Sequence, residues 1–233
     1  MTREEYINQL LGTYKIVSVL SERNENRTLR LRHKELGKDL VLRSFPKPVE
    51  TYETLCGLRC ENLPEVYESV MLEDGQIVLE EFIRGMTVAQ ALEATKYKYK
   101  DAKSILLRLC NALAVLHDRK IIHRDVKPEN VLVGDEGRVV LIDLNISRKE
   151  NRQKRDTVVM GTVGYASPEQ LGIAQSDART DIYAVGVLLN VMLTGKHPSE
   201  SMATGHAGRV VRKCLNVDPN ARYQSAKRLA EDL

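Results

Sequence analysis

Several classes of protein are excluded by what this sequence lacks. Its 233 residues include no tryptophan, two phenylalanines and four cysteines. Four scattered cysteines cannot form the dense disulfide framework of a small secreted domain. Cys56 and Cys60 are four residues apart, but no second pair of ligands lies near enough to complete a zinc site, and we expect both to be buried in a helix. The scarcity of aromatic rings also leaves little on which the bases of single-stranded nucleic acid could stack.

Long apolar runs are scarce as well. The longest candidate, residues 182–193, is about three helical turns long and contains Asn190, whereas a membrane-spanning helix needs about 20 apolar residues. The first residues, from Met1 to Glu5, do not show the basic and then apolar pattern of an export signal. We therefore expect a reduced, cytoplasmic protein with no membrane segment in this chain.

The charge balance gives a weaker indication. Lysine and arginine number 35 and acidic residues 32, and the resulting net charge of +3 does not by itself indicate a nucleic-acid partner. Basic residues gather at Arg27, Arg30, Arg32 and Lys34, and again over residues 148–155. A solvated face or loop explains each cluster more simply than an acidic partner does. We expect no nucleic-acid binding.

The hydrophobic patterns divide the sequence into two halves. Up to about residue 83, β-rich runs alternate with polar turns, and Glu73-Asp74-Gly75 predicts a hairpin in which the glycine takes a positive φ. From about residue 84, long apolar segments predict buried helices. The expected strands cover residues 14–20, 28–33, 40–45, 66–72, 76–82, 131–133 and 138–142, and the expected helices cover residues 6–11, 49–58, 103–116, 181–193, 209–215 and 224–233.

The most informative polar residues lie in the stretch 121–133. Asp125, Lys127 and Asn130 fall within six residues, on a loop expected between a buried helix and a buried strand. Asp143 follows the next strand, and a hairpin would bring it beside Asn130, where two oxygen ligands can hold Mg²⁺. Asp125 would then face an incoming hydroxyl, while Lys127 neutralises charge on a migrating phosphoryl group. Phosphoryl transfer depends on this kind of positioning and electrostatics.

The segment from His123 to Asn130 resembles the catalytic-loop signature of the eukaryotic-type protein kinase family, and Lys127 two residues after Asp125 is the serine/threonine form. The resemblance implies a bilobal α+β fold over residues 1–233. A small β-rich N-terminal lobe would cover about residues 1–83, and a larger, mainly helical C-terminal lobe about residues 84–233.

Three further segments resemble the family in the same order. Residues 161–169 resemble the end of the activation segment, with serine in place of the usual alanine. Asp181 resembles the central-helix aspartate that supports the catalytic loop, and Arg222 resembles the late arginine that pairs with Glu169. Chance agreement at one motif is plausible, but agreement at four is not.

The resemblance implies transfer of the γ-phosphate of ATP, with Mg²⁺, to a serine or threonine hydroxyl of a protein substrate. It assigns catalysis to Asp125, Lys127 and Asn130, and the metal to Asn130 and Asp143. The residues that it implies for the nucleotide are Val41, Arg43, Glu81, Ile83, Asn130 and Asp143.

The first half departs from the family pattern where nucleotide should bind. The three glycines of the phosphate-covering loop are replaced by Ser21, Arg23 and Asn26, so the backbone cannot approach phosphates as closely. The third-strand lysine is Arg43, whose fork-shaped group is not equivalent. Val41 stands where the family usually has a small alanine against adenine.

The expected partner of the third-strand cation is also altered. Thr51 occupies the place of the helix glutamate, with Glu50 and Glu53 beside it, and a one-residue slip would restore a glutamate there. Glu80 appears at the gatekeeper position, and we expect it to pair with Arg43 in place of the missing helix partner.

The metal motif is Asp143-Leu144-Asn145 in place of the family's Asp-Phe-Gly. Leu144 can pack much as phenylalanine does. Asparagine tolerates a positive φ better than most residues other than glycine, so we expect Asn145 to take the glycine's conformation.

Two functions remain open at this stage. One is a working serine/threonine kinase, slow or self-directed, that holds ATP mostly through the second lobe. The alternative is a catalytically impaired pseudokinase that acts as a binding or scaffold module. The presence of Asp125, Lys127, Asn130 and Asp143 together favours the enzyme. A small-molecule phosphotransferase shares the broad architecture but usually lacks the Lys-Pro-Glu-Asn continuation.

Other residues are assigned regulatory or structural roles by the resemblance. Arg124 could receive a phosphate on the activation segment, for which Thr157 is the candidate, or could pair locally. Thr162 is expected to orient the catalytic loop, as is His123. The short segment between residues 198 and 209 leaves no room for the family's usual docking helix, which favours a specific partner or autophosphorylation.

Overall fold

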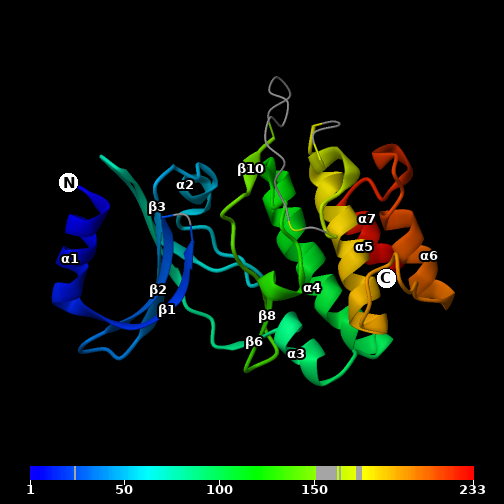
Figure 1. The fold of residues 1–233 in the computed structure, drawn as a ribbon, viewed down its shortest axis with the longest axis horizontal. Helices are drawn as coiled ribbons and strands as arrows, with labels where there is room; N and C mark the ends of the chain where they lie inside the picture. The colour runs from blue at the N-terminus through cyan, green and yellow to red at the C-terminus, as the bar shows by residue number, and fades with distance from the viewer. Residues whose placement is uncertain (24, 151–161, 163, 172–174) are drawn as a thin grey trace. The chain divides into compact units, whose positions relative to one another are not determined.

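The structure is a computed structural model in which the chain divides into two compact units, and many of their elements are labelled in Figure 1. The structure describes every residue except 24, 151–161, 163 and 172–174. Unit 1 comprises Met1–Cys60 and Pro64–Ile83, and unit 2 comprises Glu61–Leu63 and Arg84–Leu233.

The short segment Glu61–Leu63 is grouped with unit 2, although its sequence position lies within the first lobe. Its backbone is joined to strand β9 (Val139–Leu141). The backbone N–H of Leu141 donates to the carbonyl of Asn62 at 3.0 Å, and Asn62 Nδ2 donates to the carbonyl of Val139 at 2.8 Å.

Unit 1 is built on an antiparallel sheet of five strands in the order β1-β2-β3-β5-β4. The tight turn at Glu73-Asp74 joins β4 to β5, and Gly75 has a φ of 146°, as the hairpin pattern predicts. A Cβ there would lie 2.0 Å from the carbonyl oxygen of Phe45, so only glycine fits. The strands are β1 (Tyr14–Arg23), β2 (Asn26–His33), β3 (Asp39–Phe45), β4 (Val66–Leu72) and β5 (Gly75–Glu81). All five predicted strands are therefore confirmed.

Helix α1 (Arg3–Thr13) covers one face of this sheet and confirms the short helix expected before the first strand. A capping box between Thr2 and Glu5 begins it. The Lys34 ammonium ends it by donating to the carbonyls of Leu11 and Gly12 at 2.6 and 2.9 Å. The buried cluster beneath α1 consists of Ile7, Leu29, Leu31, Leu40, Leu42, Ile77 and Leu79.

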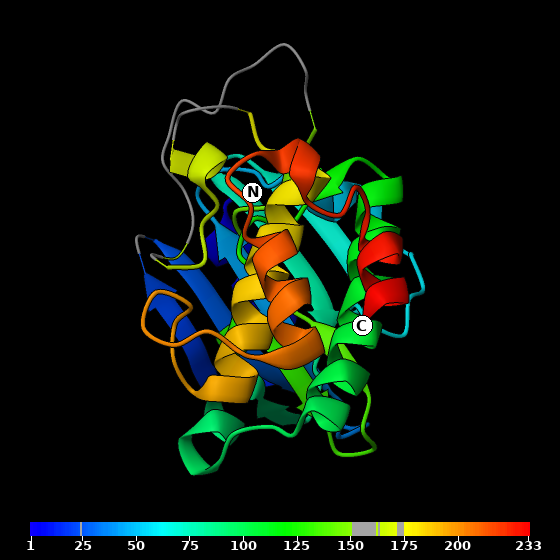
Figure 2. The ribbon, with the colours of Figure 1, turned by 90° about the vertical axis from the view of Figure 1, so that its right-hand side faces the viewer.

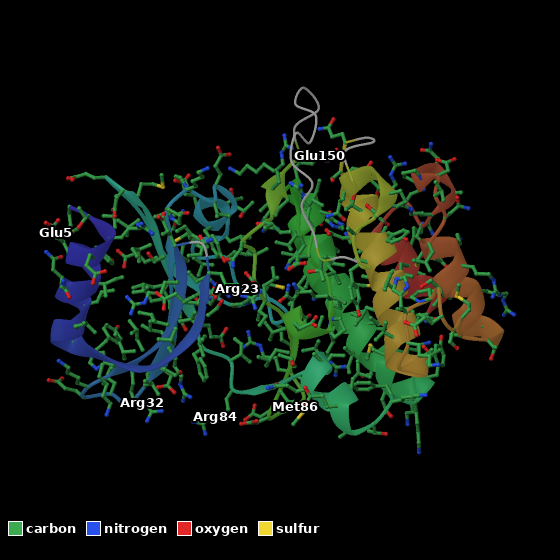
Figure 3. All side chains as sticks on the ribbon, in the orientation of Figure 1. Glu5, Arg23, Arg32, Arg84, Met86 and Glu150 are labelled. Atoms are coloured by element: carbon green, nitrogen blue, oxygen red, sulfur yellow. The ribbon has the colours of Figure 1, made fainter. Side chains whose placement is uncertain are left out.

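The first basic cluster is explained by contacts within unit 1. Arg30 and Arg32, the latter labelled in Figure 3, both donate to the carboxylate of Asp39. These two guanidinium groups, Arg32 foremost, hold the pKa of Asp39 well below its ordinary value. The Arg30 guanidinium also lies over the Phe82 ring, 4.2 Å from its centroid. The simpler interpretation, without an acidic partner, accounts for these two arginines.

Helix α2 (Thr51–Leu55) is much shorter than the predicted helix over residues 49–58. Gly57 takes a φ of 72°, a left-handed conformation that ends a helix. Cys56 is therefore exposed and Cys60 half-buried, and the prediction that both are buried in a helix is wrong. Cysteine spacing alone did not show where the helix ends.

Unit 2 is mainly helical, and its long helices confirm the predicted buried segments, with shifted ends. Figures 1 and 2 show α5 alongside α6. Gly186 makes this close packing possible, because a Cβ on it would lie 2.3 Å from Cys214 Cβ. The helices are α3 (Val88–Ala94), α4 (Tyr99–Asp118), α5 (Ala178–Thr194), α6 (Gly205–Cys214) and α7 (Ala226–Asp232).

Short strands and single helical turns complete unit 2. Strands β6 (Gly85–Thr87), β8 (Val131–Gly134) and β9 form one small sheet, and β7 (Ile121–Ile122) pairs with β10 (Arg148–Lys149). The 3₁₀ turns are η1 (Pro128–Asn130), η2 (Pro168–Leu171) and η3 (Pro219–Ala221). A β-rich unit and a mainly helical unit confirm the α+β class. Among the helices of the described residues, none is long and apolar enough to cross a membrane.

Candidate active site

The loop that follows β7 carries the predicted catalytic residues, and strands β8 and β9 fix what comes after it. Val131 pairs with Leu141 across these strands, and the Ile142 N–H donates to the Asn130 carbonyl at 2.9 Å. The hairpin expected from the sequence is therefore confirmed. It places Asn130 and Asp143 at neighbouring strand ends.

The carboxylate of Asp125 is held by three side chains. Thr162 Oγ1 donates to Asp125 Oδ1 at 2.7 Å, and Asn130 Nδ2 donates to Asp125 Oδ2 at 2.9 Å. Lys127 Nζ lies 2.8 Å from Asp125 Oδ2 and also donates to Thr162 Oγ1 at 2.8 Å. The expected contact between Thr162 and the catalytic loop is confirmed. Three residues close in sequence and one from the activation segment thus form a single network.

Asp181 on α5 anchors the backbone of this loop, as the resemblance implies. Its buried carboxylate accepts from the N–H groups of His123 and Arg124 at 2.9 and 2.8 Å, and it lies 2.7 Å from His117 Nε2. Burial alone would raise the pKa of Asp181, but the hydrogen bonds with His117 and with the His123 backbone hold that pKa below its ordinary value. An ionised carboxylate is thus stabilised at the base of the loop.

These bonds fix an unusual backbone conformation. Arg124 has a φ of 70°, a left-handed region that few residues other than glycine adopt. The Arg124 N–H is bound by Asp181, and its carbonyl accepts from Gln170 Nε2 at 3.0 Å. Gln170 and His117 were not predicted from the sequence. Gln170 directly follows Glu169, and His117 is a polar residue in the last turn of a buried helix.

His123 orients the loop through both ring nitrogens. Nδ1 accepts from the Asp125 N–H at 3.3 Å, and Nε2 lies 3.2 Å from the carbonyl of Ile142. Complete burial lowers the pKa of His123, because a charged imidazolium is poorly solvated there. The neutral ring therefore carries its proton on Nε2 and donates it to Ile142. His123 in this way links the catalytic loop to the residue before Asp143.

The predicted pair of Glu169 and Arg222 is also confirmed. Two parallel hydrogen bonds join them at 2.7 and 2.9 Å, and both side chains are buried. Burial opposes ionisation of Glu169, but the hydrogen bonds from Arg222 lower its pKa. Thr180 Oγ1 adds a bond to Glu169 at 3.1 Å. This bidentate pair fastens the end of the activation segment to the start of α5 and to η3.

The face of the unit 1 sheet opposite to the one under α1 carries the expected ion pair between Arg43 and Glu80. Arg43 Nε donates to Glu80 Oε1 at 2.6 Å, and the two side chains are 8% and 5% exposed. Val41 is also buried and lies opposite Glu80 across β3 and β5. Glu81 is the last residue of β5 and, like Ile83, is half-buried.

Helix α2 presents Thr51, and not a glutamate, to the interior. Thr51 is buried, whereas Glu50 and Glu53 are both exposed. The one-residue slip that would restore a glutamate at this position is therefore not present. The predicted loss of the helix carboxylate is confirmed.

The segment that should cover phosphates continues as paired strands. Ser21 pairs with Thr28, and Arg23 pairs with Asn26 across β1 and β2. Ordinary side chains therefore stand at the family's glycine positions in an extended hairpin. This segment lacks the backbone freedom that glycine gives.

The oxygen ligands expected for Mg²⁺ suit that ion chemically. Asn130 uses its amide nitrogen for Asp125, so its amide oxygen is the atom that a hard cation would take, together with the Asp143 carboxylate. Within the part of the chain that the structure describes, no group of three or more His, Cys, Asp or Glu could hold a metal by itself. A cation here would therefore depend on phosphate oxygens as well, as Mg²⁺ commonly does.

The turn after β9 differs from the prediction. Asp143 takes a φ of 70°, and Asn145 does not have a positive φ. The Asn145 N–H donates to Asp143 Oδ1 at 3.3 Å, so the aspartate side chain supports its own left-handed turn. The prediction for Asn145 is therefore wrong. In this turn the left-handed conformation falls on Asp143, the expected metal ligand.

Two predicted features of the activation segment lie outside the described residues. These are Thr157 and the part of the second basic run that follows Glu150, which is labelled in Figure 3. Arg124, for which phosphate binding and local pairing were both left open, is buried, with 6% of its surface exposed.

Comparison with known proteins places the chain in a family. The family model of the protein kinase domain matches residues 9–231. One relative is the "Probable serine/threonine-protein kinase" of Clostridium perfringens, 30% identical over 83% of this chain and 32% of its own length. A second relative is serine/threonine-protein kinase D of Synechocystis, which is 28% identical over 84% of this chain and 42% of its own length. A third is serine/threonine-protein kinase PrkC of Bacillus subtilis, which is 27% identical over 74% of this chain and 31% of its own length.

The chain spans less than half the length of each of these relatives. The match nevertheless covers nearly all of this chain, and the catalytic loop is held as its sequence predicts. The chain belongs to the protein kinase domain family.

Proposed function

We propose that this chain is a serine/threonine protein kinase domain that transfers the γ-phosphate of ATP to a protein hydroxyl. The observation that carries the proposal is the fixed carboxylate of Asp125, which Thr162, Lys127 and Asn130 hold together. A carboxylate held in this way can accept or orient the proton of an incoming hydroxyl. The relatives are named as serine/threonine-protein kinases, and these names support the same activity.

Each residue of the network has a separate task in this proposal. Asp125 orients the substrate hydroxyl and takes its proton. Lys127 stabilises the charge that develops on the transferred phosphoryl group. Asn130 and Asp143 would hold Mg²⁺, which supplies charge neutralisation for the phosphates when bound. Thr162 keeps Asp125 and Lys127 at fixed separation.

The nucleotide-contacting set is likewise proposed from the resemblance. Val41 would pack against the base, and Arg43 would bind phosphate oxygens. Glu81 and Ile83 would offer backbone groups to the base edge. The substrate is proposed to be a protein, which includes another copy of this chain, and the cytoplasmic location expected from the sequence stays a prediction.

A catalytically impaired binding module is the second candidate. The observation that favours it is the hairpin in which ordinary residues stand at the glycine positions Ser21, Arg23 and Asn26. Loss of one preorganised group typically slows an enzyme by about 10²–10³, and losses within one unit do not multiply simply. A slow enzyme is therefore compatible with this hairpin.

Incubation with radiolabelled ATP and Mg²⁺ tests the two candidates. The chain should label itself or a generic basic protein, and Asp125→Asn should reduce that label by about 10²-fold or more, since general base catalysis contributes this much. The matched control is Asp135→Asn, the same change at an exposed turn residue, and it should label as the wild type does. An unlabelled wild type whose melting temperature ATP and Mg²⁺ do not change would establish the binding module instead.

A further inference from the structure

The carboxylate that pairs with Arg43 comes from a neighbouring strand. Arg43 pairs with Val78 across β3 and β5, and Val41 pairs with Glu80. Arg43 and Glu80 are therefore diagonal neighbours on one face of the sheet, about 7–8 Å apart at their Cα atoms. Two long side chains bridge that distance. The ladder of backbone hydrogen bonds between the strands thus sets the separation of the two charges.

The pair is too well buried to be an incidental surface contact. Its side chains are 8% and 5% exposed, and the bond from Arg43 Nε to Glu80 Oε1 is 2.6 Å long. A buried ion pair is stable only when its geometry is good, because both charged groups have lost their hydration. The bond uses Nε, the inner nitrogen of the guanidinium. It therefore fixes the plane of the group as well as its position.

Helix α2 supplies no carboxylate for this task. It is one short turn of five residues, its buried residues are Thr51, Tyr52 and Leu55, and Glu53 on it is exposed. A helix of this length depends on its packing for its position. Strand β5, in contrast, is paired on both sides, with β3 and with β4. The backbone of Glu80 therefore cannot move away from Arg43 without breaking the sheet.

We propose that Glu80 is the positioning residue for Arg43, so that nucleotide affinity depends on the pairing of β3 with β5 and not on helix α2. The proposal rests on the proposed function, in which Arg43 binds the phosphates of ATP. Glu80 holds the guanidinium in one plane before nucleotide arrives. Preorganisation of this kind lowers the entropy lost on binding, and a planar fork is the geometry that phosphate oxygens match.

The proposal explains why two departures from the family pattern occur together. A lysine at position 43 is a point charge with three rotatable donors, and a single carboxylate would not fix its direction. Arginine gains a fixed plane from one bond at Nε. Glu80 at the gatekeeper position and Arg43 on β3 thus act together, since each supplies the partner that the other needs.

Two matched substitutions test it by separating affinity from stability. Glu80→Gln removes the charge and keeps an oxygen for Arg43, and Glu53→Gln makes the same change at the exposed position on α2. The measurements are the dissociation constant of Mg²⁺-ATP by calorimetry, and kcat and KM for ATP in the labelling assay. We expect Glu80→Gln to raise Kd and KM about tenfold, equivalent to about 1.4 kcal/mol, with kcat changed less than threefold. Glu80→Asp should recover part of the loss, and Glu53→Gln should leave both constants unchanged.

A second variant covers the case in which Glu80→Gln is too unstable to assay. Here Glu80→Asp is the variant to measure, because it keeps the buried charge while its carboxylate, one methylene shorter, cannot meet Arg43 Nε in the same geometry. A Glu80→Asp chain that melts close to the wild type but binds Mg²⁺-ATP less tightly supports the positioning role. A Glu80→Asp chain that melts close to the wild type and binds Mg²⁺-ATP equally tightly overturns it.

The remaining outcomes are also decisive. If wild type binds ATP and Glu80→Gln binds it equally well, the positioning role fails while the proposed function stands. The positioning role also fails if Glu53→Gln weakens binding as much as Glu80→Gln does. If wild type neither binds Mg²⁺-ATP nor transfers phosphate, the proposed function itself fails.

Discussion

Replacing Asp181 with asparagine tests how the catalytic loop is held. The carboxylate lies beneath the loop, fully buried, and it accepts from two consecutive backbone N–H groups and from His117. Asparagine has nearly the same shape, so the substitution opens no cavity. It does replace one acceptor oxygen with an NH₂ group and removes the charge.

The expected loss of stability follows from the groups that donate hydrogen bonds to the Asp181 carboxylate. Oδ2 serves the His123 N–H and His117, and Oδ1 serves the Arg124 N–H. In the better orientation of the amide, its oxygen keeps the first two and its NH₂ faces the third. A hydrogen bond to a charged group contributes about 1.5–3 kcal/mol, and an orphaned buried N–H costs about 1–3 kcal/mol, which together give about 2.5–6 kcal/mol. The Arg124 backbone, at a φ of 70°, then loses the bond that holds it.

Thermal unfolding and the labelling assay measure this prediction. For a domain of this size each kcal/mol shifts the melting temperature by about 2–4 °C, so Asp181→Asn should melt roughly 5–24 °C lower. The kcat should also fall, because Asp125 lies on the loop that Asp181 anchors. The matched control is Asp177→Asn, the same change at the N-cap of the same helix. Asparagine caps helices as well as aspartate does, so this variant should lose less than about 1 kcal/mol.

A result in which the two variants melt within about 2 °C of each other would refute the reasoning, because the buried donors would then be satisfied without the carboxylate. Unchanged kcat in Asp181→Asn, with lowered stability, would show that the anchor stabilises the unit without positioning Asp125.

Two further predictions concern the same network. Thr162→Val removes the hydroxyl that joins Asp125 to Lys127, so kcat should fall about tenfold, or about 1.4 kcal/mol; Thr162→Ser should restore it, and equal rates in all three proteins would contradict the role. Acidification from pH 7 to pH 5 should lower the melting temperature, because burial lowers the pKa of His123 below the 6.5 of the unfolded chain. Its stabilising effect is complete above 6.5 and is lost as the pH falls toward the folded pKa, while the unfolded state takes up the proton. His123→Gln should flatten this slope in buffers across the range, and an unchanged slope would exclude His123 as its source.

Local patterns predicted most of the elements because the two halves use different periodicities. All five strands of unit 1 were found within three residues of their ends, since β-rich runs there are bounded by polar turns. The helix predicted over residues 49–58 is too long, because apolar spacing continues past the point where Gly57 ends the helix. The prediction of a positive φ for Asn145 was wrong for a related reason. A residue's tolerance of positive φ does not show which residue of a turn will adopt it.

The sequence by itself determined the catalytic loop, its supporting residues Asp181, Glu169 and Arg222, and the departures at positions 43, 51 and 80. These features could be predicted because each is defined by the type and order of residues within a short motif. Tertiary structure decided what those departures mean. The pairing of Glu80 with Arg43 was expected from the sequence, but the strand register gives it its diagonal geometry, and only folding brings His117 and Gln170 to the loop. Such contacts join residues tens of positions apart, and they depend on packing that no local pattern contains.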